Sequence, residues 1–511
     1  MKSERHVLTS LKRYYQRIPR IAWIGLYLIL VIGALSLLFT GWAYDDPFIT
    51  YRYAENLSRG LGLTYNPGEI RLSTTTPLFA LLLAALHPLW PDLPNLAVII
   101  GACSMAAGGL FLWDFLYLPG SKFSRWAGLL FYPLFPLVTS TLGSETPLYL
   151  AFCLGAFASY RRQHYRLAAL SAALAVLTRP DGALIAVILG LHYICSHPPQ
   201  KHQWRLWIAS LPRQSILIYI LIGSAWLIYA WATYGSPIPL TLFAKQQQAL
   251  VAGSQAFLPG LRTIMSWYSS WFYQLLTLLA LSGLALGLLR SSALRWLAAW
   301  TLLYFIAYSL LGVTRYFWYY APLVPLFLAG FGWGLEGIAD LLKLLLHKVR
   351  VPNVAAVALH TTARLLPVVI LLFLLLLQAG KLWNQHLRPD ARYPIYRAAG
   401  EWLRQNTPAN ASVGTLEVGI IGYYARRPMI DFSGLIQPDI AVALGQTGSY
   451  AAAAYWAVTQ YTPDVLVLQQ GLFPEIESTI LSHCQLEISY PGADYDYAFN
   501  LGIYTCPPAS G

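Results

Sequence analysis

Apolar segments long enough to cross a lipid bilayer, about 20 residues each, recur along most of this 511-residue chain. Charged residues make up only 11% of the sequence, whereas about 25% is usual in soluble domains. The N-terminal region lacks the small-residue cleavage site of a signal peptide. These features exclude a soluble globular protein and predict a polytopic α-helical membrane protein.

The clusters of positively charged residues occupy alternate loops. The formal net charge is +12, but its distribution follows the positive-inside rule rather than the pattern of a nucleic-acid-binding surface. The basic segment 1–21 is therefore predicted to be cytoplasmic. Further basic clusters that we assign to the same side are Lys122/Arg125, Arg161/Arg162/Arg166, Lys201/Arg205/Arg213, Arg290/Arg295 and Lys343/Lys348/Arg350.

The hydropathy pattern predicts about eleven transmembrane helices within residues 22–383, with the N-terminus inside and the C-terminus outside. The long loop 43–95 then lies outside. Its apolar stretch 77–90 is short for a crossing, so we interpret it as a re-entrant or interfacial helix. The predicted spans are 22–42, 96–118, 125–141, 147–160, 166–178, 182–196, 215–233, 268–289, 294–311, 318–341 and 364–383.

The composition changes after residue 383. Segment 384–511 combines an amphipathic helix, turn signals and short apolar runs suited to strands, which predicts a small extracytoplasmic α/β domain. Cys484 and Cys506 fall in this domain, where an oxidising compartment would permit a disulfide. The sequence leaves open whether they pair. The other three cysteines lie in apolar spans and are expected to pack as small hydrophobic side chains.

Two adjacent carboxylates, Asp45 and Asp46, follow the first apolar segment in "GWAYDDPFITYRYAEN". One interpretation is that they are solvated groups at a helix end. The other is that one of them is a general base, since a partly desolvated carboxylate can take a proton from a hydroxyl. Tyr51 and Arg52 follow in a segment rich in aromatic and polar residues, which suggests the lining of a cleft.

Two further outer segments carry charges. Glu145, in "GSETPLY", either favours the N-terminus of the next helix or faces the same outer cleft as the aspartates. Arg179 and Asp181, in "LTRPDGAL", either close a turn as an ion pair or present Arg179 to an anionic ligand. Charges in such an apolar setting are costly and are usually paired or functional.

Cations are scarce on the predicted outer face of the membrane part. Lys245 lies in "YGSPIPLTLFAK", and Arg315 precedes Tyr316 in "TRYFWYYAPLVP". This aromatic cluster is either an interfacial belt with a snorkelling arginine or part of a binding site. A lipid-linked phosphate at the outer leaflet would need such cations.

The sequence contains no P-loop, no Gly-x-Ser-x-Gly elbow and no His/Cys set with metal-ligand spacing. We therefore predict no metal site, although the aspartate pair is compatible with a divalent cation. No other cofactor is indicated.

Several of these segments, in order over nearly the full chain, resemble the GT-C superfamily of membrane glycosyltransferases. The resemblance extends to bacterial members related to the mycobacterial terminal arabinofuranosyltransferase, and more distantly to protein O-mannosyltransferases and the lipid A aminoarabinose transferase. The segments are "DDPFITYRYAENLSRGLGLTYNPGE", "STTTPLFALLLA", "GSETPL", "TRPDG", "YGSPIPLTLFAK", "RYFWYYAPLVP", "GEWLRQNTPANASV" and "GIIGYYARRPMIDFSGL".

The resemblance implies an inverting glycosyltransferase of the bacterial inner membrane that uses a polyprenyl-phosphate-linked sugar on the extracytoplasmic face. Its acceptor would be a hydroxyl of a glycan, lipid or protein. One aspartate of the pair would be the base, Glu145 a second acidic group, and Tyr51, Arg52 and Tyr316 would line the sugar or acceptor site. The donor phosphate would be held by Arg179, Lys245 and Arg315.

Two other classes of function compete with this one. A lipid-linked glycan transporter would show charged groups near mid-membrane and pseudo-symmetric halves, whereas the charges here gather towards one face. A non-catalytic cell-envelope assembly protein would use the outer domain to bind a partner.

Overall fold

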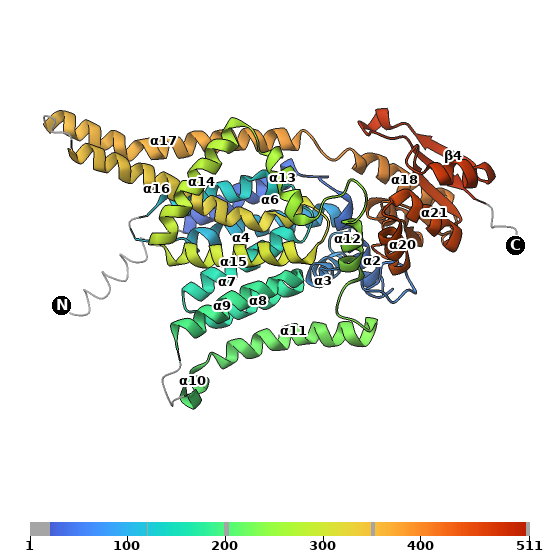
Figure 1. The fold of residues 1–511 in the computed structure, drawn as a ribbon, viewed down its shortest axis with the longest axis horizontal. Helices are drawn as coiled ribbons and strands as arrows, with labels where there is room; N and C mark the ends of the chain where they lie inside the picture. The colour runs from blue at the N-terminus through green and yellow to red at the C-terminus, as the bar shows by residue number, and fades with distance from the viewer. Residues whose placement is uncertain (1–20, 120, 199–203, 349–352, 507–511) are drawn as a thin grey trace.

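The computed structural model describes residues 21–119, 121–198, 204–348 and 353–506. Nearly all of the basic segment 1–21, Lys201 and Arg350 lie outside these residues. A bundle of long helices forms most of the molecule, and a small α/β domain lies against one end of it (Figure 1). The predicted architecture of a helical membrane part followed by a small sheet domain is therefore confirmed.

Seven helical segments are long and apolar enough to cross a membrane, among the residues that the structure describes. They are Ile21–Leu38, α4 (Leu93–Phe115), α11 (Arg213–Tyr234), α14 (Trp271–Arg290), α15 (Ser292–Leu311), α16 (Val324–Lys348) and α17 (Asn353–His386).

The remaining predicted spans coincide with shorter or interrupted helices. These are α5 (Phe123–Phe131), which continues into α6 (Pro136–Thr139) through a 3-10 turn, α7 (Thr146–Arg161), α8 (Tyr165–Thr178) and α9 (Ala183–Ser196). Pro133 and Pro136 explain the interruption, because proline removes a backbone donor and disfavours helix at the preceding residue. The count of about eleven crossings stays a prediction.

The segment between the first helix and α4 leaves and re-enters the bundle at the same end. The backbone N–H of Gly41 donates to the Asn95 side chain over 3.0 Å, which places the end of the first helix beside the start of α4. The segment contains α2 (Asp45–Ser58) and α3 (Pro77–Leu86). With ten residues, α3 is about 15 Å long, half the thickness of a bilayer core.

Small residues let the central helices approach closely. A Cβ on Gly283 of α14 would collide with the backbone of Gly330 in α16, so glycine is required at this crossing. Three peripheral helices complete the membrane part: α10 (Trp204–Ser210), α12 (Leu240–Gln248) and α13 (Phe257–Trp267).

The C-terminal domain is built on a five-stranded sheet with the order β2-β1-β3-β5-β4. Strand β1 pairs in parallel with β2 and β3, whereas β5 pairs antiparallel with β3 and β4. The strands are β1 (Val413–Thr415), β2 (Met429–Asp431), β3 (Val465–Gln469), β4 (Gln485–Tyr490) and β5 (Leu501–Thr505). The helices are α18 (Arg392–Asn406), α19 (Ile420–Ala425), α20 (Pro438–Thr447) and α21 (Tyr450–Tyr461).

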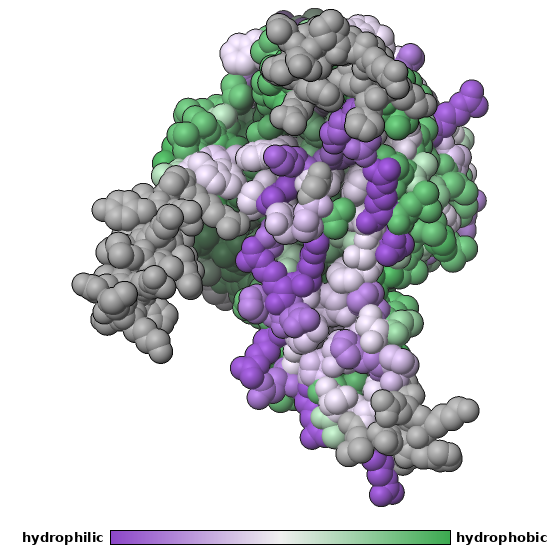
Figure 2. All heavy atoms as spheres, turned by 90° about the vertical axis from the view of Figure 1, so that its left-hand side faces the viewer, coloured by the Kyte–Doolittle hydropathy of each residue, from purple (hydrophilic) through white to green (hydrophobic). Residues whose placement is uncertain are grey.

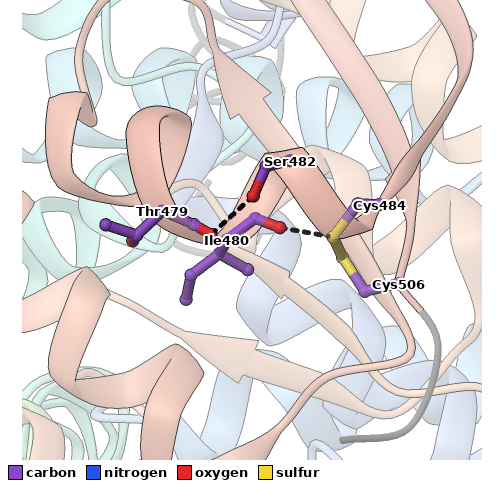
Figure 3. The surroundings of a disulfide bond; sticks show 5 residues. All are labelled: Thr479, Ile480, Ser482, Cys484 and Cys506. Carbon is purple, nitrogen blue, oxygen red and sulfur yellow. Dashed lines mark hydrogen bonds between the residues drawn. A yellow bond between two sulfur atoms is a disulfide. The ribbon is translucent and has the colours of Figure 1, made fainter.

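A disulfide between Cys484 and Cys506 joins the residue before β4 to the residue after β5 (Figure 3). The pairing that the sequence left open is therefore present in the structure. It fixes the edge of the sheet far from the helical bundle.

The sheet domain docks on α2 and on the loop that follows it. Arg52, which is buried, donates to the carbonyl oxygens of Gly422 and Arg427. The side chain of Asn66 both donates to and accepts from the backbone of Met429 at 3.0 Å, as a neighbouring strand would. These contacts hold the carboxyl end of β1 over the end of the bundle.

The opposite end of the bundle is hydrophilic. Figure 2 shows polar residues gathered on this end, with apolar surface on its flanks. Ion pairs between Arg162 and Asp114 and between Arg290 and Asp340 connect its helices.

Candidate functional site

The two adjacent aspartates point in different directions because a helix begins at Asp45. Successive residues of an α-helix are rotated by about 100°, so neighbours in sequence lie on different faces. Asp46 and Thr50, four residues apart, line a cavity at the end of the bundle. Asp45 and Arg52, seven residues apart, instead face the sheet domain.

Asp45 holds the sheet domain in place. Its carboxylate oxygens accept hydrogen bonds from the backbone N–H groups of Gly419 at 2.9 Å and Ile420 at 2.8 Å. Glu417, two residues after β1, lies close to the same carboxyl group. Burial and the proximity of Glu417 raise the pKa of Asp45 well above its ordinary value, and burial raises the pKa of Glu417. The two carboxyl groups therefore retain a proton above the usual carboxyl range.

Asp46 forms an ion pair with Lys245 of α12, with 2.8 Å between Oδ2 and Nζ. The Lys245 ammonium also faces the aromatic rings of Tyr316 at 4.6 Å and Trp318 at 5.2 Å. The ring faces attract the cation and orient it towards the cavity. The pair is thus a carboxylate and an ammonium presented side by side at a cavity wall.

The cavity has a volume of about 450 Å³, within the usual range of small-molecule sites. It lies where α2, α7, α9, α12 and α15 end or begin, beneath the sheet domain, which contributes Leu435. Its charged lining residues are Asp46, Glu145, Arg179, Asp181 and Lys245.

Arg179 and Asp181 form an ion pair and also face the cavity, so both features expected of their turn are present. They form a two-pronged ion pair, with Nη2 to Oδ2 at 2.8 Å and Nε to Oδ1 at 3.2 Å, and they also line the cavity. Tyr308 of α15 accepts from Arg179 at 2.7 Å. Burial raises the pKa of Glu145, and the nearby Arg179 opposes this effect. Glu145 precedes α7 without capping it through its side chain.

One wall of the cavity carries hydroxyl groups. The Thr50 and Thr76 hydroxyls lie 3.1 Å apart, as do those of Thr74 and Thr76. Ser73 and Thr241 also line the cavity, and their buried hydroxyls have no hydrogen-bond partner among the described residues. The run "STTT" in an apolar setting is the sequence signal that could have identified this wall.

Another wall is apolar and continues to the outside of the bundle. Leu184, Ile238 and Leu311 line it, and Ile238 and Leu311 are 62% and 39% exposed. The cavity therefore connects a charged interior with a surface suited to lipid chains.

Besides Asp45, the structure places four of the predicted site residues outside the cavity wall. The hydroxyl of buried Tyr51 donates to the Gly143 carbonyl, and Arg52 is used in docking the sheet domain. Arg315 contacts the Gln255 side chain at 3.3 Å and packs over Gly260. Tyr316 lies behind Lys245 and donates to Gln248 at 2.8 Å. For Tyr51 and Arg52 the reason is helical rotation, and for Arg315 it is the turn at Gly312 that redirects the chain after α15.

The part of the chain that the structure describes contains no cluster of three or more His, Cys, Asp or Glu side chains placed to hold a metal ion. Asp46 is paired with Lys245, and a cation at this position would have to compete with the ammonium group.

Comparison with known proteins gives one family match and several structural matches. Residues 383–504 match a family described as a domain of unknown function (DUF8728). A search among curated proteins gives no significant match.

The structure is similar to ArnT from Cupriavidus metallidurans bound to undecaprenyl phosphate, with a TM-score of 0.57 at 15% identity. The match covers 96% of this chain and 98% of ArnT. The apo state of the same protein gives a TM-score of 0.55 at 14% identity, covering 95% of this chain and 98% of that chain. This chain therefore shares the fold of ArnT over nearly its full length, as the resemblance implied.

Proposed function

We propose that this protein is a glycosyltransferase that moves a sugar from a polyprenyl-phosphate-linked donor to a hydroxyl acceptor. The observation that carries the proposal is the cavity in which the Asp46–Lys245 pair and Arg179 converge beside an apolar wall. The likeness to ArnT, whose structure contains undecaprenyl phosphate, supports a lipid-phosphate donor. The proposed location is the extracytoplasmic face of the bacterial inner membrane, in keeping with the distribution of basic loops.

In the proposed reaction, Asp46 accepts the proton of the acceptor hydroxyl as that oxygen attacks the anomeric carbon. The bond between the anomeric carbon and the phosphate oxygen breaks, and the phosphate leaves with the electron pair. Attack from the face opposite the leaving group inverts the anomeric centre. Asp46 is favoured over Asp45 as the base because it lines the cavity, whereas both oxygens of Asp45 already accept backbone hydrogen bonds.

Lys245 and Arg179 are proposed to stabilise the leaving phosphate. Charge-assisted hydrogen bonds to a phosphate are roughly twice as strong as neutral ones, and they strengthen as negative charge develops in the transition state. Lys245 lies next to Asp46, so the cation and the base would flank the anomeric carbon from the side of the leaving phosphate and from the side of the attacking hydroxyl. Glu145, near both cations, is proposed to contact the sugar or the acceptor.

The lipid part of the donor is proposed to leave the cavity along its apolar wall. Ile238 and Leu311 are exposed at this edge, where a bilayer would surround the bundle. A polyprenyl chain could then remain in the membrane while its phosphate reaches Lys245. The hydroxyl wall around Thr50 and Thr76 offers hydrogen-bond partners to the sugar.

The test is sugar transfer by the purified full-length protein in lipid nanodiscs, supplied with labelled polyprenyl-phosphate pentoses and hexoses and with membrane glycolipid acceptors. Asp46→Asn keeps the shape of the side chain and removes the base, so kcat is expected to fall by about a hundredfold or more. Asp45→Asn serves as the neighbouring control and is expected to leave kcat of the folded fraction within about tenfold. Full activity of Asp46→Asn would exclude the assigned base, and absence of transfer and of donor binding in the wild type would exclude the function.

A further inference from the structure

We propose that the end of the bundle opposite the sheet domain carries a binding site for an anionic phospholipid, between α8, α9 and α11. The proposal concerns a cavity of about 630 Å³ where the α7–α8 turn meets the start of α11. This cavity shares no lining residue with the candidate active site. Its proposed ligand takes no part in the proposed reaction.

The cavity is lined by cations and lacks a carboxylate. Arg166 of α8 and Arg213 of α11 face it, together with His164 and Gln214. Within the described residues neither arginine forms an ion pair with an acidic side chain, in contrast to Arg162, which pairs with Asp114 over the same turn. The unneutralised pair of arginines complements a phosphate.

The helices themselves add to this potential. Both α8 and α11 begin at the cavity, and neither has a side-chain cap at its N-terminus. Their first backbone N–H groups and helix dipoles therefore favour an anion at this position.

Ser215 adds a hydroxyl group to the cavity wall. This residue is 7% exposed and lines both the cavity and the adjoining slot. Its hydroxyl can donate a hydrogen bond to a phosphate oxygen in the cavity.

The cavity continues into an apolar slot of about 190 Å³ between α8, α9 and α11. The two spaces share Tyr165, Pro212 and Ser215 as lining residues. Ala172 of α8 and Leu189 of α9 belong to the walls of the slot. A cationic cavity that opens into a narrow apolar slot matches a phosphate headgroup attached to an acyl chain. A free phosphate would leave the slot empty.

The position of α11 suggests a structural role for such a lipid. Of the most apolar 18-residue stretch of α11, only 6% is buried in the protein. The helix runs along α8 at the periphery of the bundle (Figure 1). Figure 2 shows that the end where α11 begins is rich in polar residues, as the headgroup region of a leaflet requires. A lipid held between α8 and α11 would connect the peripheral helix to the bundle.

The headgroup is tested by native mass spectrometry of the full-length protein, released from nanodiscs that contain phosphatidylglycerol and phosphatidylcholine. The wild type should retain phosphatidylglycerol preferentially. The double variant Arg166→Gln/Arg213→Gln should bind it about thirtyfold more weakly, from roughly 1 kcal/mol for each cation near a membrane surface. The control Lys122→Gln/Arg295→Gln removes two exposed cations from the same end, outside the cavity, and should retain binding within about threefold. Equal losses in both double variants would overturn the site in favour of general surface charge.

The acyl slot is tested separately with Gly190→Leu. A Cβ at Gly190 meets nothing within 4 Å and the residue lines the slot, so leucine should fill the slot without disturbing the fold. Gly223→Leu, in α11, is the matched control, since its Cβ also meets nothing within 4 Å and it does not line the slot. Loss of phosphatidylglycerol in Gly190→Leu alone supports the proposal. Equal retention of phosphatidylglycerol in both variants would overturn it. So would displacement of this lipid by inorganic phosphate alone, or a preference for undecaprenyl phosphate.

Discussion

Replacing Asp45 with asparagine should loosen the contact between the sheet domain and the helical bundle. In the wild type both carboxylate oxygens of Asp45 accept backbone N–H groups, from Gly419 at 2.9 Å and from Ile420 at 2.8 Å. Asparagine has one acceptor oxygen, and its amide group would face the other N–H. One buried donor is then left unpaired, which costs about 2–3 kcal/mol. The population of the undocked state should therefore rise by about 30- to 150-fold.

Hydrogen–deuterium exchange measures this change at the residues concerned. The amides of Gly419 and Ile420 should exchange about 30- to 150-fold faster in Asp45→Asn, because exchange follows the local opening equilibrium. Asp46→Asn is the control, since Asp46 contacts Lys245 rather than these amides. Unchanged protection at the two amides, or equal acceleration in both variants, would refute the assignment of Asp45 to domain docking.

Three further predictions concern single side chains. Lys245→Met should raise the donor KM by about 10- to 100-fold through loss of a charge-assisted bond to phosphate, whereas Arg315→Met, outside the cavity, should not; steady-state kinetics with labelled donor decides. Burial raises the pKa of Glu417, so its stabilising contribution is fully present below the ordinary carboxyl range near about pH 4 and is lost as pH rises through the raised pKa. Glu417→Gln should flatten the fall of the thermal midpoint with pH, and an unchanged slope would contradict the raised pKa of Glu417. Cys484→Ser should destabilise the sheet domain by about 3 kcal/mol, because the disulfide closes a loop with a sequence separation of 22 residues; a midpoint equal to that of the wild type in a thermal melt without reductant would contradict this.

Hydropathy alone located the long apolar helices of this protein. Each predicted span coincides with a helix or with an interrupted helix such as α5–α6, because burial in lipid demands long apolar runs with satisfied backbone groups. The short stretch 77–90 contains a helix of ten residues, α3, and its interpretation as a re-entrant or interfacial helix stays a prediction. The change in composition near residue 383 predicted a separate C-terminal domain, and in the structure α17 ends at His386 before the first helix of the sheet domain, α18.

The interior of the site was harder to predict. Sequence adjacency suggested that Asp45 and Asp46 act as a pair, yet the helix that begins at Asp45 sends them to different surfaces. Glu417 lies more than 370 residues from Asp45 along the chain, and only the docked sheet domain brings them together. Lys245 was identified by its rarity as an outer cation, but its pairing with Asp46 depends on the position of α12.

The most direct test of the account is a cryo-electron-microscopy structure of the full-length protein with undecaprenyl phosphate. We expect phosphate density in the cavity beside Asp46, within hydrogen-bonding distance of Lys245 or Arg179, and lipid density along the wall formed by Ile238 and Leu311. Phosphate bound at Arg315, or a cavity that stays empty at saturating lipid, would contradict it.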